Sequence, residues 1–237
     1  MDCTSVLRAI EAMPASRARV KPLIFSPNSN VDFWLKSISF RDHAYKMGGL
    51  PTMARGLFIA ERDGSSYVLA RGYDKFFNIG ETKDTTWDAL RTTTTGPYEI
   101  TAKENGCIIL ISVIEGYLIV TSKNSVGRAL GGQESHADVG RRWLATHLQR
   151  SGKSESDLID ALVKQNLTAV CELADDEFEE HIIAYRPEAS GLYLHGLNEN
   201  ILGFQSKSMQ SVREFAEQFG LFSVSSRIVH GIDGSSL

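Results

Sequence analysis

The sequence predicts an α+β fold with a mostly antiparallel sheet and flanking helices. Two apolar runs, residues 57–59 and 67–70, flank Asp63-Gly64, a pair that readily adopts the positive φ angles of a tight hairpin turn. Residues 107–113 and 117–121 form a second pair of runs, around Glu115-Gly116. From His136 onward the apolar residues recur with a helical period. Helices inserted among antiparallel strands are typical of this class.

The first 50 residues are expected to hold a helix and a basic connector. Four apolar residues lie at helical spacing before Pro14: Val6, Leu7, Ile10 and Met13. Residues 15–27 are basic and lack a regular apolar period, so we expect an irregular segment there. The main core is therefore expected to begin after residue 50.

Strands and helices alternate in the second half of the chain. The expected elements are helices at 139–148, 158–163 and 212–221, and strands at 169–173, 182–185 and 192–194. Ser154 is the expected N-cap of the second of these helices. The serine-rich end is expected to be unstructured. The three tryptophans, Trp34, Trp87 and Trp143, are expected in the core.

Composition is that of an ordinary globular protein. Of 237 residues, 42% are hydrophobic and 23% charged, and the net charge is −4, which gives no global attraction to nucleic acid. Cys3, Cys107 and Cys171 are far apart, which predicts no disulfide framework and no structural metal site. The longest apolar stretch, residues 107–120, is interrupted and too short for a membrane span. We expect an intracellular protein, in the nucleus or the cytoplasm.

Lys103-Glu104-Asn105-Gly106 places one lysine at a strand end, before a glycine and a long apolar run. This arrangement suits a lysine that forms a covalent bond to a nucleotide, and it also suits a solvated β-turn. Residues 71–78 combine cations, turn-formers and aromatic side chains. That segment forms either the wall of a ligand site or a loop whose aromatic side chains fill the core.

The order of several motifs decides between these alternatives. The segments are Ala54–Leu57, Tyr73–Asn78, Gly96–Glu99, Lys103–Cys107, Ser122–Asn124, Ala137–Gly140 and Cys171–Leu173. In this order and spacing the chain resembles the N-terminal adenylyltransferase domain of fungal tRNA ligase, and more distantly the phage RNA ligase that repairs broken tRNA. The resemblance implies a covalent nucleotidyltransferase (RNA/DNA ligase) fold in residues 51–237, a partial adenylyltransferase domain.

The resemblance implies ATP-dependent RNA ligation through a lysyl-AMP intermediate on Lys103. Four matching positions would bind ATP through its phosphates or its nucleoside: Arg55 and Lys75 on the β- and γ-phosphates, and Glu104 and Gly106 beside Lys103. Cations suit the phosphates because pyrophosphate is the leaving group. Lys123 would add to the positive field that favours the amine form of Lys103.

Two further contacts follow from the resemblance. Glu172 would contact the ribose or a metal-bound water, with Mg²⁺ accompanying ATP and no direct protein ligand to the metal. His181 with Arg186 would bind the phosphate of the RNA end. Tyr185, Tyr193 and His195 either line the nucleotide pocket or are ordinary sheet packing.

The implied partners are tRNA exon halves, one ending in a 2′-phosphate and 3′-hydroxyl and the other in a 5′-phosphate. A spliced messenger RNA is a further implied substrate. The full-length protein would also carry kinase and cyclic phosphodiesterase domains.

The chain departs from the ligase pattern in two places. Asn105 stands where related nucleotidyltransferases have aspartate, although asparagine fits the fungal branch. After Gly220 no Glu-Gly-hydrophobic strand and no Lys-x-Lys pair follows, so the fold is expected to be incomplete at its C-terminus. Two alternatives stay open: a non-catalytic nucleotide- or RNA-binding remnant, and a GTP-dependent capping-type transferase.

We predict that this chain alone seals RNA weakly or not at all. Loss of a Lys-x-Lys strand removes stabilisation of transition-state charge, for which a single oxyanion donor contributes about 2.7 to 4 kcal/mol. The assay incubates the purified chain with labelled ATP, magnesium and RNA ends. Label on Lys103 together with efficient joining would contradict the prediction.

Overall fold

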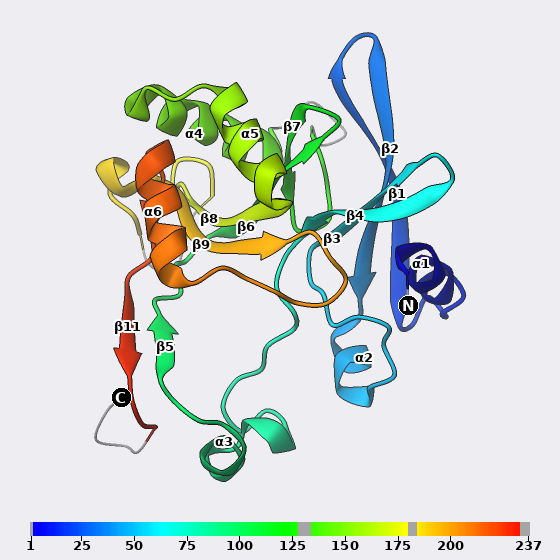
Figure 1. The fold of residues 1–237 in the computed structure, drawn as a ribbon, viewed down its shortest axis with the longest axis vertical. Coiled ribbons are helices and arrows are strands. Elements are labelled where there is room, and N and C mark those ends of the chain that lie inside the picture. Colours follow the sequence, from blue (N-terminus) through cyan, green and yellow to red (C-terminus); the bar gives the residue numbers. More distant parts are fainter. Residues whose placement is uncertain (1, 128–133, 180–183, 233–237) are drawn as a thin grey trace.

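The computed structural model describes residues 2–127, 134–179 and 184–232. Within these ranges the elements form four layers (Figure 1): the helix α1 (Cys3–Glu11), a four-stranded sheet, a five-stranded sheet and a layer of three helices. The expected α+β class with mostly antiparallel strands is confirmed, because β10–β9 is the one parallel pair among the described strands.

The four-stranded sheet is a simple antiparallel meander. Its strands are β1 (Ala18–Asn28), β2 (Val31–Phe40), β3 (Leu57–Arg62) and β4 (Ser65–Arg71). Asp63 and Gly64, with φ of 50° and 74°, make the β3–β4 turn. The hairpin predicted from the Asp-Gly pair is confirmed. A short helix, α2 (Asp42–Met47), follows β2.

Residues 15–27 are not an irregular connector, and this expectation is wrong. Most of them form β1, which pairs with β2 from Ala18 opposite Phe40 to Asn28 opposite Val31. β1 is an edge strand with little burial, so it needs no apolar alternation and it tolerates Pro22. β2 in turn pairs with β3, and the residues on both sides of position 50 therefore share one sheet.

The five-stranded sheet carries the segments around Lys103. Its order is β10-β9-β8-β6-β7, with β6 (Cys107–Ile114), β7 (Tyr117–Ser122), β8 (Leu167–Ala174), β9 (Gly191–Glu199) and β10 (Phe222–Ser223). One face packs on α4 (His136–Ser151), α5 (Glu155–Gln165) and α6 (Met209–Phe219). The predicted helices are confirmed, including the Ser154 cap of α5, whose side chain accepts from the Asp157 N–H.

The end of the described chain is structured. β11 (Ser226–Val229) pairs with β5 (Tyr98–Thr101), which follows the short helices η1 (Lys83–Thr85) and α3 (Trp87–Thr93). The expectation of an unstructured end is therefore wrong for residues 222–229, because a strand far away in the sequence supplies the pairing. Residues 233–237 lie outside the described residues.

Two of the three tryptophans are not in the core. The exposed fraction of Trp34 is 69% and that of Trp87 is 40%, so both expectations are wrong. Trp143 does pack against the helical face of the five-stranded sheet, and its Nε1–H donates to Asp175 at 2.7 Å.

Of the strand expected at 182–185, residues 184 and 185 are irregular, and 182 and 183 lie outside the described residues. None of the described helices combines the length and the apolar character that a membrane crossing requires.

The two large sheets meet at a polar seam centred on Arg71, whose side chain is fully buried. Its guanidinium donates to Gly72 O (2.8 Å), Ile201 O (3.2 Å), Leu202 O (3.2 Å) and the Asp74 carboxylate (2.5 Å). The backbone of Arg71 is also bonded across the seam: its N–H donates to Thr168 Oγ1 on β8 and its carbonyl accepts from Asn198 on β9. The sequence segment after β4 is therefore held against the second sheet.

We predict that Arg71→Met lowers the free energy of unfolding by about 3 kcal/mol, because three carbonyl groups at the seam and the Asp74 carboxylate lose a charged donor. Urea denaturation followed by circular dichroism measures the change. The control is Arg62→Met, whose side chain is 67% exposed and whose loss should cost about 0.5 kcal/mol or less. Equal effects of the two substitutions would show that the seam does not hold the sheets together.

Candidate functional site

Lys103 and Lys123 lie at the same end of the β6–β7 hairpin. Lys103 comes just before β6, and Lys123 directly follows β7. Ile109 near the start of β6 pairs with Ser122 at the end of β7, so both lysines lie at the open end of this hairpin. The two cations that flank this hairpin in the sequence are thereby brought to one end of the second sheet.

The segment that carries Lys103 is anchored on its N-terminal side. The N–H of Ala102 donates to the carbonyl oxygen of Ser225 at 2.9 Å, just beyond the β5–β11 ladder. The Lys103 side chain itself is exposed, and its Nζ donates to the Glu104 carbonyl at 3.2 Å. A fixed backbone with an accessible amine suits a nucleophile that must reach a bound ligand.

Gly106 brings the Lys103 segment onto β8. A Cβ at this position would lie 2.0 Å from the Leu173 carbonyl oxygen and 3.1 Å from Cγ of Glu172. No side chain fits between these backbones, so glycine is required for the close approach. The contact places Glu172, on β8, next to the segment that begins at Lys103.

Tyr185 holds the two residues between Lys103 and Gly106. Its hydroxyl accepts from the Asn105 N–H at 2.7 Å and donates to the Glu104 carboxylate at 2.9 Å. Burial raises the pKa of Tyr185 to about 12, so the hydroxyl keeps its proton for this donation. The Glu104 side chain therefore supports the loop, whereas the sequence placed it at the ATP.

Glu172, His195 and Tyr73 form a partly buried group next to this loop. His195 Nε2 lies 3.9 Å from Glu172 Oε2, and the His195 ring stacks on Tyr73 with 5.5 Å between ring centres. The Tyr73 hydroxyl donates to the His195 carbonyl at 2.7 Å and lies 3.0 Å from its Nδ1. Which of the two ring nitrogens carries the proton depends on the tautomer of the imidazole.

The His195 imidazole is neutral. Burial lowers its pKa to about 4, a hydrogen bond with the Cys171 backbone opposes the shift, and the positive charge of Lys103 adds to it. Nε2 is buried and has no hydrogen-bond partner in the part of the chain that the structure describes. An unpartnered buried ring nitrogen, within the electrostatic influence of Lys103, suits a ligand that offers it a hydrogen bond.

Four cations surround a hollow of about 310 Å³ between the two sheets: Arg19, Arg41, Arg55 and Lys123. Asp42 is the acidic residue of its lining. Burial and the positive charge of Arg55 lower the pKa of Lys123, Asp42 opposes the shift, and Lys75 adds to it. Crowded cations around one hollow are suited to a polyphosphate. We call this the basic hollow.

Arg55 and Lys75 are held on neighbouring extended segments. The Arg55 N–H donates to the Tyr73 carbonyl at 2.7 Å, and the Lys75 N–H donates to the Met53 carbonyl at 2.8 Å. Lys75 Nζ donates to the Phe76 carbonyl at 2.8 Å and lies 4.6 Å from the centre of the Phe77 ring. Lys75 is not among the residues that line the basic hollow; its charge acts on Lys123, and its ammonium lies over an aromatic ring.

The structure brings together most, but not all, of the predicted site residues. Lys103, Gly106 and Glu172 form one group, and Arg55 and Lys123 form the basic hollow. Arg186 is exposed and precedes the short helix η2 (Pro187–Ala189). His181 lies outside the described residues, so its pairing with Arg186 stays a prediction.

Sequence reasoning missed two members of the basic hollow, Arg19 and Arg41. Both lie in the segment expected to be separate from the core, where basic residues signalled only a connector. For Tyr193 the sequence left two roles open, lining the nucleotide pocket or packing within the sheet. Its hydroxyl donates to the Ala189 carbonyl at 2.7 Å and its ring packs on Phe222 at 5.0 Å, so it is part of the sheet packing.

Solved structures share this architecture. Two forms of an archaeal ATP-dependent RNA ligase superpose with TM-scores of 0.53 and 0.55, at 15% identity, over 95% of this chain and 50% of theirs. This chain thus shares the fold of that RNA ligase.

The chain belongs to the RNA ligase family, whose model matches residues 53–234. tRNA ligase 1 of Schizosaccharomyces pombe is 52% identical over 186 residues, which are 77% of this chain and 24% of that protein. The tRNA ligase of Candida albicans is 40% identical over 216 residues, 83% of this chain and 26% of that protein. The resemblance to fungal tRNA ligases is confirmed, and the chain spans about a quarter of the length of these relatives.

We predict that His195 makes stability fall as the pH is lowered below about 6.5. In the unfolded chain His195 binds a proton below about pH 6.5, whereas in the folded chain it does so only below about pH 4. Acidification therefore favours the unfolded chain, and the stability present at pH 7 is lost. Between pH 7 and pH 5 the loss is about 2 kcal/mol. Urea denaturation of the wild type and of His195→Asn at both pH values measures it. If both proteins lose the same amount, His195 is not the group responsible.

Proposed function

We propose that this chain is the adenylyltransferase part of an ATP-dependent RNA ligase, with Lys103 as the nucleophile. The observation that carries the proposal is the position of Lys103 at the hairpin end that also presents Lys123 to the basic hollow. A nucleophile on one side and an anion-binding hollow on the other are the two parts that nucleotidyl transfer needs. Membership of the RNA ligase family supports the same conclusion.

In the first step the Lys103 amine attacks the α-phosphorus of ATP. A nitrogen–phosphorus bond forms, the bond to the pyrophosphate oxygen breaks, and the ammonium proton passes to solvent. The negative charge that develops on pyrophosphate would lie in the basic hollow, where Arg55, Arg41 and Lys123 stabilise it. AMP then passes to an RNA 5′-phosphate, and an RNA 3′-hydroxyl displaces it.

With its proton on Nδ1, a neutral His195 would favour adenine over guanine. In that tautomer Nε2 is an acceptor, and it has no partner among the described residues and lies next to Glu172. The exocyclic amino group of adenine is a donor, whereas guanine has a carbonyl oxygen at the same ring position. A buried acceptor opposite that oxygen would be left unpaired. This preference supports ATP as the nucleotide substrate and argues against a GTP-dependent capping-type enzyme.

A divalent metal, Mg²⁺, would accompany ATP. Glu172 is held rigidly on β8 beside Gly106, which fits contact with the ribose or with a metal-bound water. The metal would neutralise part of the phosphate charge, and the chain's own cations would neutralise the remaining charge.

The RNA substrate is inferred from the relatives, which are named tRNA ligases. We infer tRNA exon halves, with a spliced messenger RNA as a second substrate, and His181 with Arg186 on the 2′-phosphate. For a protein that acts on such RNAs we propose the nucleus or the cytoplasm as its location. We also infer kinase and cyclic phosphodiesterase domains as partners of this chain in a full-length protein.

Covalent labelling tests the proposal. We expect the purified chain with Mg²⁺ to become labelled from ATP carrying the label on the α-phosphate, and not from ATP labelled on the γ-phosphate or from α-labelled GTP. Lys103→Arg keeps the positive charge but removes the nucleophile, and it should abolish labelling. Lys153→Arg, at an exposed position between α4 and α5, should label like the wild type.

The basic hollow is tested in the same assay. Arg55→Ala should slow labelling about a hundredfold and Arg41→Ala about tenfold, because each removes a cation from the leaving group. Arg62→Ala, outside the hollow, should leave the rate unchanged. Absence of any label would favour the non-catalytic remnant, and label from GTP alone would favour the capping-type transferase.

A further inference from the structure

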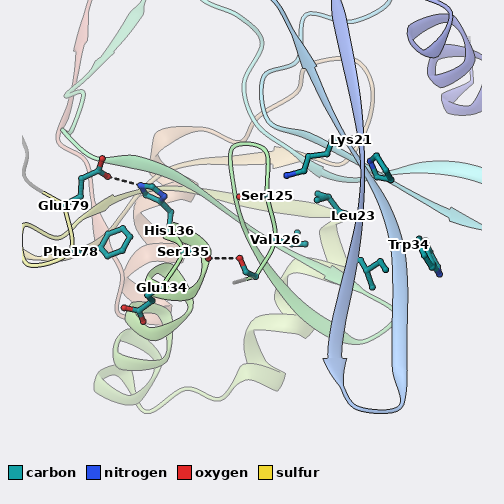
Figure 2. Close-up of a pocket in the computed structure, with 13 residues that line it drawn as sticks. Lys21, Leu23, Trp34, Ser125, Val126, Glu134, Ser135, His136, Phe178 and Glu179 are labelled. Carbon is teal, nitrogen blue, oxygen red and sulfur yellow. Dashed lines mark hydrogen bonds and ion pairs between the residues drawn. The ribbon is translucent and has the colours of Figure 1, made fainter. Parts of the chain in front are cut away.

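Three side chains that bind transition metals converge where β6 begins, just after the Lys103–Gly106 loop. They are Cys107, His136 and Glu179, and one ligand atom of each lies within 4.8 Å of the others. His136 Nε2 and Glu179 Oε2 are 2.8 Å apart and point toward one another (Figure 2). No Cys-x-x-Cys or similar spacing marks this group in the sequence, because its members come from three distant segments.

Each member sits on a rigid element. Cys107 is the first residue of β6 and pairs with Leu173 on β8. His136 is the first residue of α4, whose start is fixed by reciprocal capping between Ser135 and Asp138.

Glu179 ends a turn that is built around the Asp175 carboxylate. That carboxylate accepts from the N–H groups of Glu177 (3.1 Å) and Phe178 (3.3 Å). The turn is thereby tied to the end of β8, so all three ligand atoms are positioned before any ligand arrives.

The group has one apolar wall and one open side. Phe178 packs edge-on against the His136 ring at 5.1 Å, and Phe178 and Cys107 both pack against the core. On the other side, His136 and Glu179 line a hollow of about 980 Å³ that reaches the β1–β2 hairpin (Figure 2). Their side chains are 41% and 52% exposed, so water reaches the ligand atoms.

We propose that Cys107, His136 and Glu179 bind a zinc ion, with water as the fourth ligand. Thiolate, imidazole and carboxylate together are a ligand set for Zn²⁺ and not for Mg²⁺ or Ca²⁺, which prefer oxygen alone. On binding, the sulfur–zinc bond replaces the sulfur–hydrogen bond, and the thiol proton passes to solvent. The ion would link β6, α4 and the turn after β8 directly behind the Lys103–Gly106 loop.

Cobalt is the probe, because Co²⁺ takes the same ligands and a thiolate bound to it gives a near-ultraviolet charge-transfer band. We expect the full chain to bind one Co²⁺ with this band, and Zn²⁺ to displace it. Cys107→Ser should remove the band, and Cys3→Ser, the control for another half-buried thiol, should keep it. No band in the wild type, or a band that survives Cys107→Ser, would overturn the proposal.

Glu179→Gln tests the carboxylate on its own and changes no buried residue. Zinc affinity, measured by competition with a chromogenic chelator, should weaken at least about tenfold. Glu177→Gln, an exposed glutamate of the same turn, is the matched control and should bind zinc as the wild type does. Equal affinity of the two variants would show that Glu179 is only a hydrogen-bond partner of His136. Thermal denaturation shows whether each variant is folded. If Cys107→Ser is unfolded, the zinc affinity of Glu179→Gln decides whether the group binds zinc.

Discussion

The buried guanidinium of Arg71 is the constraint on which the arrangement of the two sheets depends. A fully buried cation is costly unless it is hydrogen-bonded. The Nε, Nη1 and Nη2 atoms of Arg71 all donate, to three carbonyl groups and to the Asp74 carboxylate. Two of these carbonyls belong to the segment after β9, whereas Asp74 lies beyond β4. The satisfied charge therefore selects one relative position of the sheets among the many that apolar packing alone would allow.

The candidate site depends on that position. The segment after Arg71 carries Tyr73, which stacks on His195 of the second sheet, and Lys75, whose positive charge helps to lower the pKa of Lys123. The second sheet contributes Lys103 and Glu172, brought together by the backbone contact of Gly106 with Leu173. The nucleophile and Lys123 thus belong to the second sheet, whereas Arg19, Arg41 and Arg55 belong to the first sheet and its connections, and the buried seam sets their relative position.

Local signals in the sequence predicted much of the fold, and family resemblance predicted much of the site. The Asp63-Gly64 hairpin, the capped helix after Ser154 and the strand after Lys103 are all present, because turn chemistry and apolar period are local properties. β1 and β11 were missed because their pairing comes from distant partners. For the same reason Arg19 and Arg41 were not expected near Arg55, and the group of Cys107, His136 and Glu179 has no signature in sequence spacing.

A crystal structure of this chain with Mg²⁺ and an ATP analogue that resists attack at the α-phosphorus tests the central claim most directly. The account predicts the triphosphate in the basic hollow between Arg41, Arg55 and Lys123, the base near His195, and Lys103 Nζ in line with the α-phosphorus. A nucleotide bound elsewhere, such as in the hollow next to Trp34, with Lys103 remote from every phosphate, would contradict it.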